Sequence, residues 1–315
     1  MTATALNEVD FIDLYLGEDY AEIKGLVGDS RFLSSVPENL MDDVLKLKAH
    51  CLNTQRESGR SEFSLFHGER LYRATVNKGI RGEPDLVLRQ TPVGVRAFAS
   101  IPLSTPLRKS IEIPSAAGLV LIAGDMGSGK TTTAASILSH RIAVTGTLGV
   151  AIQDPTEILV QGRHGNGRCI QLEVRENEGY ASAVRKAYRM GAGAFFLGEI
   201  RDAATAHEVL RASLSMFVLS TIHGSSWKEA LERYVMFCEA ISPSAKANIA
   251  STLFVLAHQT MRIDPGNNRR SVDITGFNLR DTPARDTIQA KITAGNFKSL
   301  TDQLGSIQYN FEEKP

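Results

Sequence analysis

The sequence predicts an α/β fold: a domain with a mostly parallel sheet, preceded by a small α+β domain. From about residue 107 onward, short apolar runs alternate with helix-favouring runs, which is typical of a parallel sheet covered by helices on both faces. Before residue 104, one helical pattern gives way to alternating strand patterns. The stretch 101–106 carries two prolines and is the predicted linker. We therefore expect domains at residues 1–104 and 107–315.

The N-terminal domain is predicted to hold one helix followed by three strands. Apolar residues recur at near-helical spacing over residues 37–53, and Pro37 suits a first helical turn because its missing N–H is no loss there. The hydrophobic period then changes to two. Strands are expected at residues 63–66, 71–76 and 86–89, with a tight turn joining the first two.

The second domain is predicted to alternate strands with helices. Its strands are short apolar runs at residues 119–123, 148–153, 194–197 and 217–221. The helices between and after them are expected at residues 131–144, 180–190, 203–214 and 226–239. From about residue 243 we expect a helical subdomain, with a helix over 245–261, a strand at 272–277 and a helix at 283–292.

A glycine-rich segment joins the first of these strands to the first helix. It satisfies the pattern G-x-x-x-x-G-K-[ST] in the strand–loop–helix setting that gives the pattern its meaning. Glycines let the backbone curl until several N–H groups and the helix N-terminus face one anion. The lysine supplies a charge for the β- and γ-phosphates, and the threonine a hydroxyl for Mg²⁺. The expected cofactors are ATP and Mg²⁺, bound by Gly124, Asp125, Met126, Gly127, Ser128, Gly129, Lys130, Thr131 and Thr132.

Two further strands end in residues that suit the same chemistry. Glu199 follows a buried strand, where a carboxylate can hold the water shell of Mg²⁺ or the attacking water. A surface ion pair with Arg201 would explain Glu199 as well. His223 ends another strand, where it could hydrogen-bond a γ-phosphate, although a lone histidine can also be a packed or surface residue.

An acidic turn follows the strand predicted at 148–153. Asp154 and Pro155 set a turn that aims Glu157, which makes Glu157 the better candidate for activating water. Asp154 acting only as a cap of that turn explains the segment equally well. The carboxyl ends of parallel strands meet at one edge of a sheet, so we expect these acids beside the glycine-rich loop.

Composition narrows the class of protein. The formal net charge is zero and the pI is near 7.1, so the global basic footprint of a nucleic-acid or anionic-lipid binder is missing. The three cysteines are far apart in the sequence and form no C-x-x-C pair, so neither a zinc site nor a disulfide framework is indicated. The N-terminus lacks the features of a signal peptide, and no apolar run reaches the ~18 residues of a transmembrane helix. We expect a cytoplasmic protein.

These motifs, taken in order, resemble those of the secretion-traffic ATPases, which drive type IV pili and type II and type IV secretion. That superfamily has a Walker A loop, an Asp box, a Walker B strand ending in Gly-Glu-hydrophobic-Arg-Asp, and a His box. In this chain the four motifs correspond to residues 124–131, 154–157, 198–202 and 221–223. The N-terminal strands around residues 72–73 and 88–92 also resemble the arginine-bearing strands of the superfamily.

The resemblance implies a RecA-like motor domain with a PAS-like N-terminal domain, assembled as a homo-hexameric ring that hydrolyses ATP. It implies a catalytic set of Glu157, Glu199, His223, Arg81 and Arg89, in which the two arginines complete the site in the assembled ring. Thr131 and Glu199 would hold Mg²⁺, partly through water. The implied partner is an inner-membrane platform protein, which would bring the chain to the membrane periphery, with no direct nucleic-acid contact.

Within the superfamily the chain is most similar to the pilus-retraction ATPases, because it is compact and lacks a four-cysteine insert. An ATPase of a conjugative, type IV or type II secretion system is the alternative. Three other classes are weighed against this interpretation: a P-loop kinase, a nucleic-acid translocase, and a scaffold that binds ATP without hydrolysing it. The sequence shows no acceptor-binding lid, which argues against a kinase. Its neutral net charge argues against a translocase, and the presence of Glu157 and Glu199 argues against a scaffold that does not hydrolyse ATP.

Overall fold

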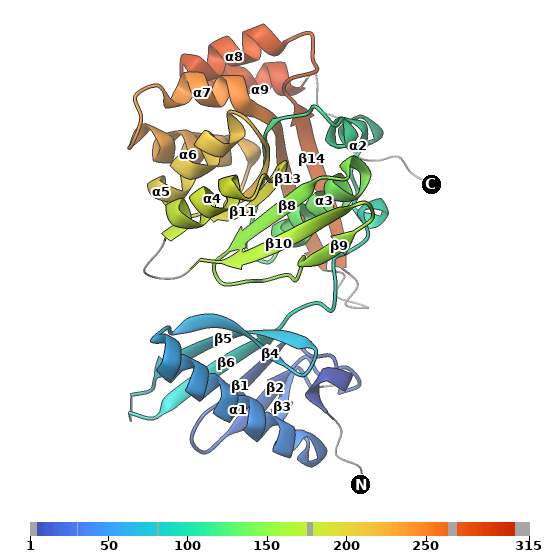
Figure 1. The fold of residues 1–315 in the computed structure, drawn as a ribbon, viewed down its shortest axis with the longest axis vertical. Helices are drawn as coiled ribbons and strands as arrows, with labels where there is room; N and C mark the ends of the chain where they lie inside the picture. The colour runs from blue at the N-terminus through green and yellow to red at the C-terminus, as the bar shows by residue number, and fades with distance from the viewer. Residues whose placement is uncertain (1–4, 30, 81, 175–178, 264–269, 306–315) are drawn as a thin grey trace. The chain divides into compact units, whose positions relative to one another are not determined.

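The chain folds into two compact units, each with its own sheet (Figure 1). The computed structural model describes residues 5–29, 31–80, 82–174, 179–263 and 270–305. The first unit comprises Met1–Gly94 together with Asp154–Leu159, and the second comprises Val95–Gln153 and Val160–Pro315. The predicted linker at 101–106 lies in the second unit, where α2 (Thr105–Glu112) begins inside it. In the described ranges, no helix combines the length and the apolarity needed to cross a bilayer.

The first unit is an antiparallel sheet with one long helix. Over the described residues, the strands follow the order β3-β2-β1-β6-β5-β4, and each neighbouring pair is antiparallel. The elements are a 3₁₀ turn η1 (Leu6–Glu8), β1 (Asp13–Leu16), β2 (Ala21–Lys24), β3 (Leu33–Ser35), α1 (Glu38–Ser58), β4 (Glu62–His67), β5 (Arg70–Lys78) and β6 (Pro84–Gln90). The predicted helix and three strands are present as α1, β4, β5 and β6.

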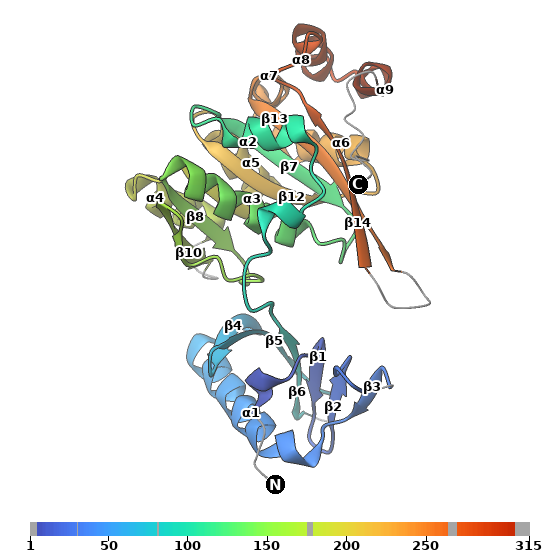
Figure 2. The same ribbon diagram turned by 90° about the vertical axis from the view of Figure 1, so that its right-hand side faces the viewer.

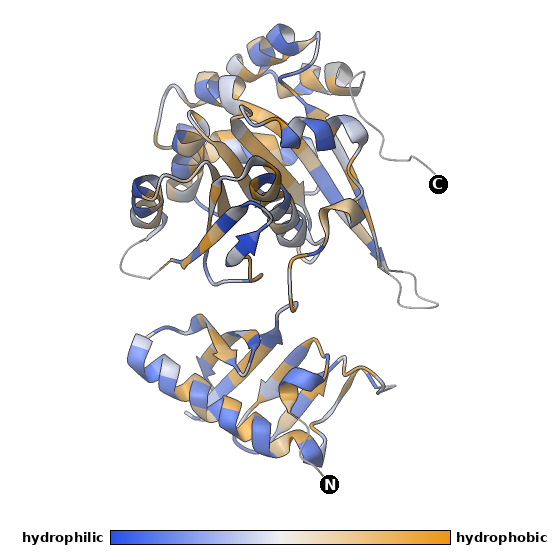
Figure 3. Ribbon diagram, turned by 45° about the vertical axis from the view of Figure 1, so that its right-hand side comes forward, coloured by the Kyte–Doolittle hydropathy of each residue, from blue (hydrophilic) through white to orange (hydrophobic). Residues whose placement is uncertain are grey.

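Helix α1 packs on the sheet through a single apolar stripe. Leu40, Val44, Leu47 and Cys51 recur every three or four residues, and all four are buried in the core of this unit. Figure 3 shows the resulting bands of hydrophobic and hydrophilic residues along the helix. Gly59 ends the helix in a left-handed conformation that suits glycine, and its N–H donates to a carbonyl of the last turn.

The second unit is built on the mostly parallel sheet that the sequence predicts. Among the described residues the strand order is β14-β13-β7-β12-β11-β8-β10-β9, with β14 and β9 antiparallel at the two edges and the inner strands parallel. The strands are β7 (Gly118–Gly124), β8 (Leu148–Gln153), β9 (Gly162–His164), β10 (Gly167–Glu173), β11 (Ala194–Ile200), β12 (Phe217–His223), β13 (Leu253–Ile263) and β14 (Arg270–Asn278).

Helices cover both faces of this sheet (Figure 2). Besides α2 they are α3 (Lys130–Thr145), α4 (Gly179–Arg189), α5 (Ala203–Ser213), α6 (Trp227–Glu239), α7 (Ala245–Thr252), α8 (Arg285–Thr293) and α9 (Phe297–Gly305), and a 3₁₀ turn η2 (Phe98–Ser100) precedes α2. On β7, Leu119 and Leu121 pack in the core shared with α5 and α6, while Val120 and Ile122 face α2 and α3. Burial on both faces explains why this strand is a continuous apolar run.

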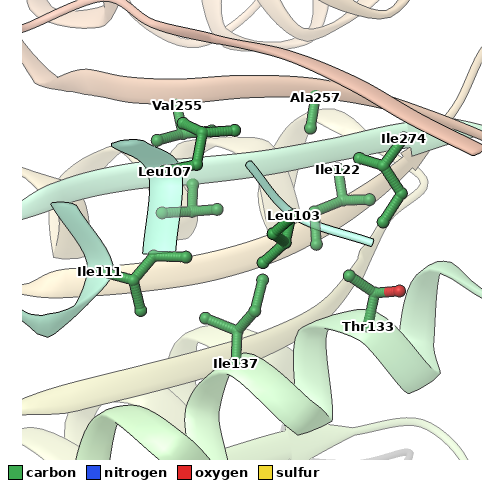
Figure 4. A pocket seen from close by; sticks show the side chains of 10 residues that line it. Leu103, Leu107, Ile111, Ile122, Thr133, Ile137, Val255, Ala257 and Ile274 are labelled. Atoms are coloured by element: carbon green, nitrogen blue, oxygen red, sulfur yellow. The ribbon is translucent and has the colours of Figure 1, made fainter. Parts of the chain in front are cut away.

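Apolar side chains fill the space between α2, α3 and the sheet, around a small cavity (Figure 4). Leu107 and Ile111 project from α2, and Ile137 comes from α3. They face Ile122 of β7 and Val255 of β13. These contacts are part of the core, and they hold α3 and the loop before it against the sheet.

The helix predicted over 245–261 is wrong. Helix α7 ends at Thr252, and the chain continues as β13, which pairs with β7 in parallel and with β14 in antiparallel register. The apolar run Leu253–Ala257 is buried from both sides, so it carries no period that separates a strand from a helix. Pairing with β7 and β14 decides between the two, and the expected helical subdomain is consequently limited to α7, α8 and α9.

Candidate active site

The segment between β7 and α3 is a tight loop shaped by glycines. Gly124, Gly127 and Gly129 have φ values of 152°, 76° and 89°, which residues with side chains rarely adopt. A side-chain carbon on Gly124 would clash with the main-chain oxygen of Gln259, so the loop leaves β7 pressed against β13. The loop ends at Gly129, and α3 begins at Lys130.

The loop contains a buried cation and a buried hydroxyl that suit an anion. Lys130 is 6% exposed, and its ammonium donates to the carbonyl oxygens of Gly124 (2.9 Å) and Asp125 (2.8 Å). The hydroxyl of Ser128 is buried and has no hydrogen-bond partner among the described residues. Burying a polar atom without a partner is costly. An anion at the N-terminus of α3 would accept a hydrogen bond from this hydroxyl and would be attracted by the charge of Lys130.

Glu199 and His223 join Lys130 at the same edge of the sheet. Strands β11 and β12 are parallel neighbours, and their register shifts between Leu197 and Glu199. His223 Nε2 lies 2.5 Å from Glu199 Oε1, and His223 Nδ1 lies 3.4 Å from Lys130 Nζ. An ammonium has protons but no lone pair, so Nδ1 accepts from Lys130 and Nε2–H donates to Glu199. Three sequence-predicted residues therefore form one continuous chain of contacts.

The second oxygen of Glu199 accepts from an exposed arginine. Arg201 Nε lies 2.7 Å from Glu199 Oε2, so the ion pair considered from the sequence exists alongside the contact with His223. Asp202 has a structural explanation, because its carboxylate caps α5 by accepting from the N–H of Thr205 at 2.7 Å.

The acidic turn after β8 belongs to the first unit and is held there by arginines. Glu157 Oε1 accepts from Arg73 Nη1 of β5 at 2.9 Å. Asp154 pairs with Arg60 at 2.5 Å. A side chain of β5 thus contacts the carboxylate of Glu157. Sequence reasoning did not single out Arg73 for this contact, since 84 residues separate the pair.

Arg89 lies on β6 and forms an ion pair with a buried acid. Its Nε lies 2.8 Å from Oδ1 of Asp13, which is 1% exposed, while the guanidinium side chain is 60% exposed. Burial opposes ionisation of Asp13, but the hydrogen bonds and charges of Arg89 and Lys24 outweigh it and hold the pKa of that carboxyl below its usual value. Arg81 lies outside the described residues.

The remaining predicted ligands lie along the loop and the start of α3. Asp125 and Met126 are exposed, and Thr131 and Thr132 sit in the first turn of the helix, half-buried. A further residue of this region, Gln259 of β13, was missed because the sequence placed it in a helix. Its side chain contacts both the loop and α3.

Comparison with known proteins decides the family. The family model described as type II/IV secretion system protein matches residues 102–296, which is more than half of the chain. The chain belongs to this family. The predicted resemblance to the secretion-traffic ATPases is thereby confirmed.

Curated relatives of the family include pilus and secretion proteins. The chain is 29% identical over 195 residues to the type IV pilus retraction ATPase PilT of Pseudomonas aeruginosa, covering 56% of this chain and 55% of PilT. It is 31% identical over 197 residues to the type II secretion system protein HxcR of the same organism, covering 62% of this chain and 38% of HxcR. The chain spans about half the length of PilT and about two fifths of the length of HxcR.

Solved structures of two ATPases share the fold. The pilus retraction motor PilT with bound ADP superposes with a TM-score of 0.75 at 23% identity, covering 95% of this chain and 86% of PilT. The ATPase DotB of Legionella pneumophila gives a TM-score of 0.73 at 21% identity, covering 96% of this chain and 85% of DotB. The predicted RecA-like domain with a preceding small domain is confirmed at the level of fold.

Proposed function

We propose that this chain is a Mg²⁺-dependent ATPase that powers type IV pilus retraction. The observation that carries the proposal is the chain of contacts from Lys130 through His223 to Glu199 at the N-terminus of α3. Phosphoryl transfer to water requires a lysine that binds phosphate and polar or acidic groups placed close to it, and these three residues are in contact. The similarity to PilT supports the choice of machine.

The residues of the loop would bind the nucleotide. Lys130 and the N–H groups that precede it would hold the phosphates, and the hydroxyl of Ser128, which has no partner in the described part of the chain, fits the same anion. Thr131 and Glu199 would hold Mg²⁺, partly through water. When bound, the ion supplies positive charge that offsets the charge developing on the phosphate oxygens.

Hydrolysis needs groups that orient and activate water. Glu157 is the proposed general base, and Arg73 holds its carboxylate in one direction until the site assembles. His223 would sense the γ-phosphate, because it already contacts both Lys130 and Glu199.

Arginines from the N-terminal domain would stabilise transition-state charge in an assembled homo-hexamer. Arg89 is the proposed residue with the clearest geometry, since Asp13 anchors one side of its guanidinium while much of the side chain stays accessible. Arg81 is proposed for the same role from the sequence resemblance alone. An inner-membrane platform protein is the proposed partner, and it would place the ring at the cytoplasmic face of the inner membrane.

A second candidate is a motor of a secretion or conjugative system. The match to HxcR, at 31% identity over 62% of this chain, favours it. The two candidates share the same chemistry and differ in the machine that the ring drives.

Deleting the gene from its native host should separate these candidates. A retraction motor predicts that the cells keep surface pili but lose surface motility, and that the wild-type gene, but not a Lys130→Ala copy, restores motility. The measurement is pilus number by electron microscopy together with motility. Unchanged pili and motility with loss of protein secretion or DNA transfer would contradict retraction and support the second candidate.

A further inference from the structure

A buried glutamine on β13 connects the phosphate loop to the helix after it. Gln259 is 1% exposed, and both ends of its side-chain amide are occupied. Its Nε2 donates to the carbonyl oxygen of Ser128 at 2.5 Å, and its Oε1 accepts from the hydroxyl of Thr133 at 2.8 Å. One side chain thus bonds to the last turn of the loop and to the first turn of α3.

The same residue also touches the start and the end of the loop. Gln259 is the register partner of Gly124 in the parallel pair of β13 and β7. A side-chain carbon on Gly124 would collide with the main-chain oxygen of Gln259, and one on Gly129 would lie 3.0 Å from its Nε2. Gln259 is therefore packed against both glycines that delimit the loop.

Holding the Ser128 carbonyl also fixes the direction of one N–H group. A trans peptide is planar, so its C=O and the following N–H point in opposite directions. With the Ser128 carbonyl bonded to Gln259, the N–H of Gly129 points away from β13. Gly129 has φ 89° and no side chain, so little else in its own residue opposes rotation of that peptide. A rotated peptide would direct a carbonyl oxygen, instead of an N–H group, at an anion.

We propose that Gln259 is a positioning residue that keeps the Ser128–Gly129 peptide in its anion-binding orientation. The inference rests on the proposed nucleotide site. Gln259 itself does not touch the phosphates. It acts through the loop, and its loss weakens nucleotide binding because the loop spends part of its time with a carbonyl oxygen facing the anion.

Two substitutions separate the bonds that Gln259 makes. Gln259→Met keeps the length of an unbranched, buried side chain and removes both hydrogen bonds. Thr133→Val removes the hydroxyl that donates to Gln259 but leaves the bond to Ser128 in place. We expect Gln259→Met to weaken binding of a fluorescent ADP analogue with Mg²⁺ by about tenfold, because the loop loses a hydrogen bond and one peptide dipole no longer faces the anion. Thr133→Val should weaken the same binding by less than about threefold.

Gln259→Glu adds a readout that a purely structural role would not move. An ionised carboxylate cannot donate to the Ser128 carbonyl, whereas a protonated carboxyl can. The affinity of Gln259→Glu relative to wild type should therefore rise as the pH falls from about 9 to about 6, where a buried carboxyl takes up its proton. Taking the ratio to wild type at each pH removes the titration of the nucleotide itself.

The controls distinguish failure of this inference from failure of the proposed function. Asn278→Leu removes another buried amide of the same sheet, on β14, and should lower thermal stability without changing the affinity of the folded protein. If wild type binds the analogue, Lys130→Ala does not, and Gln259→Met binds as well as wild type, the role of Gln259 is overturned and the nucleotide site stands. If wild type itself does not bind the analogue, both the role of Gln259 and the proposed nucleotide site are overturned. Should Gln259→Met not fold, the pH response of Gln259→Glu decides: a constant ratio below 1 overturns the proposal.

Discussion

Replacing Lys130 with alanine should abolish ATP hydrolysis and weaken nucleotide binding. Lys130 is buried at the start of α3, where its ammonium already bonds to two carbonyl oxygens of the loop and contacts His223. Removing it takes away the charge that the phosphates would meet and breaks the link to Glu199. We expect steady-state phosphate release to fall by about 10²–10³-fold or more, the loss seen when one electrostatic stabiliser of a transition state is removed.

A lysine on the surface provides the matched control. Lys109 lies on α2 and is exposed, so Lys109→Ala should leave hydrolysis unchanged. Circular dichroism of both variants should match wild type, which shows that the loss is not unfolding. An alanine variant of Lys130 with near-wild-type activity would overturn the assignment of the phosphate loop.

Replacing Glu199 with glutamine should leave nucleotide bound but slow its turnover. The amide keeps the shape of the side chain and can still accept from Nε2–H of His223, while it loses the charge that would position Mg²⁺ and water. We expect kcat to fall by about 10²-fold or more with little change in the dissociation constant for ATP. Single-turnover phosphate release and equilibrium binding of the same variant measure the two quantities.

An exposed acid of α6 is the corresponding control. Glu232 forms an exposed 3.8 Å pair with Lys228 one turn away, so Glu232→Gln should leave kcat unchanged. A Glu199→Gln variant that turns over at the wild-type rate would remove the proposed role. A variant that fails to fold would make Glu199 a structural residue.

The parallel sheet could be predicted because several of its strands have a recognisable local sequence pattern. Leu119–Ala123 is a short, wholly apolar run between two glycines, and Phe217–Thr221 begins with three apolar residues, which is typical of strands buried on both faces. The run at Leu253–Ala257 has the same property but follows a helix without a break. Its pairing with β7 and β14 joins residues that are distant in the sequence, so the local pattern does not reveal it. The sequence alone favoured a helix there.

The first three strands were missed for a related reason. Strands β1, β2 and β3 are three or four residues long and hold few apolar side chains, such as Leu14 and Ile23. Their existence depends on β1 pairing with β6, about 75 residues further along the chain. A local sequence pattern cannot indicate a pairing between strands so far apart in the chain.

The candidate site was predictable in part. Lys130, Glu199 and His223 follow strands of one parallel sheet, so their meeting at its carboxyl edge follows from the topology. The side chains that contact the phosphate loop and the predicted residues of the first unit did not follow from it. Gln259 depends on β13 being a strand, while the pairs Arg73–Glu157 and Arg89–Asp13 join residues distant in sequence.

In the proposed function, this chain hydrolyses ATP as a member of an assembled ring. The most direct test is the rate of phosphate release per subunit, measured with Mg²⁺ and ATP over a wide range of protein concentration and paired with sedimentation at each concentration. We predict hydrolysis that appears with a species of about six subunits and falls away on dilution, because the arginines of the N-terminal domain would act in the ring. Full activity per subunit in a monomer, or no hydrolysis by the assembled ring, would contradict the account.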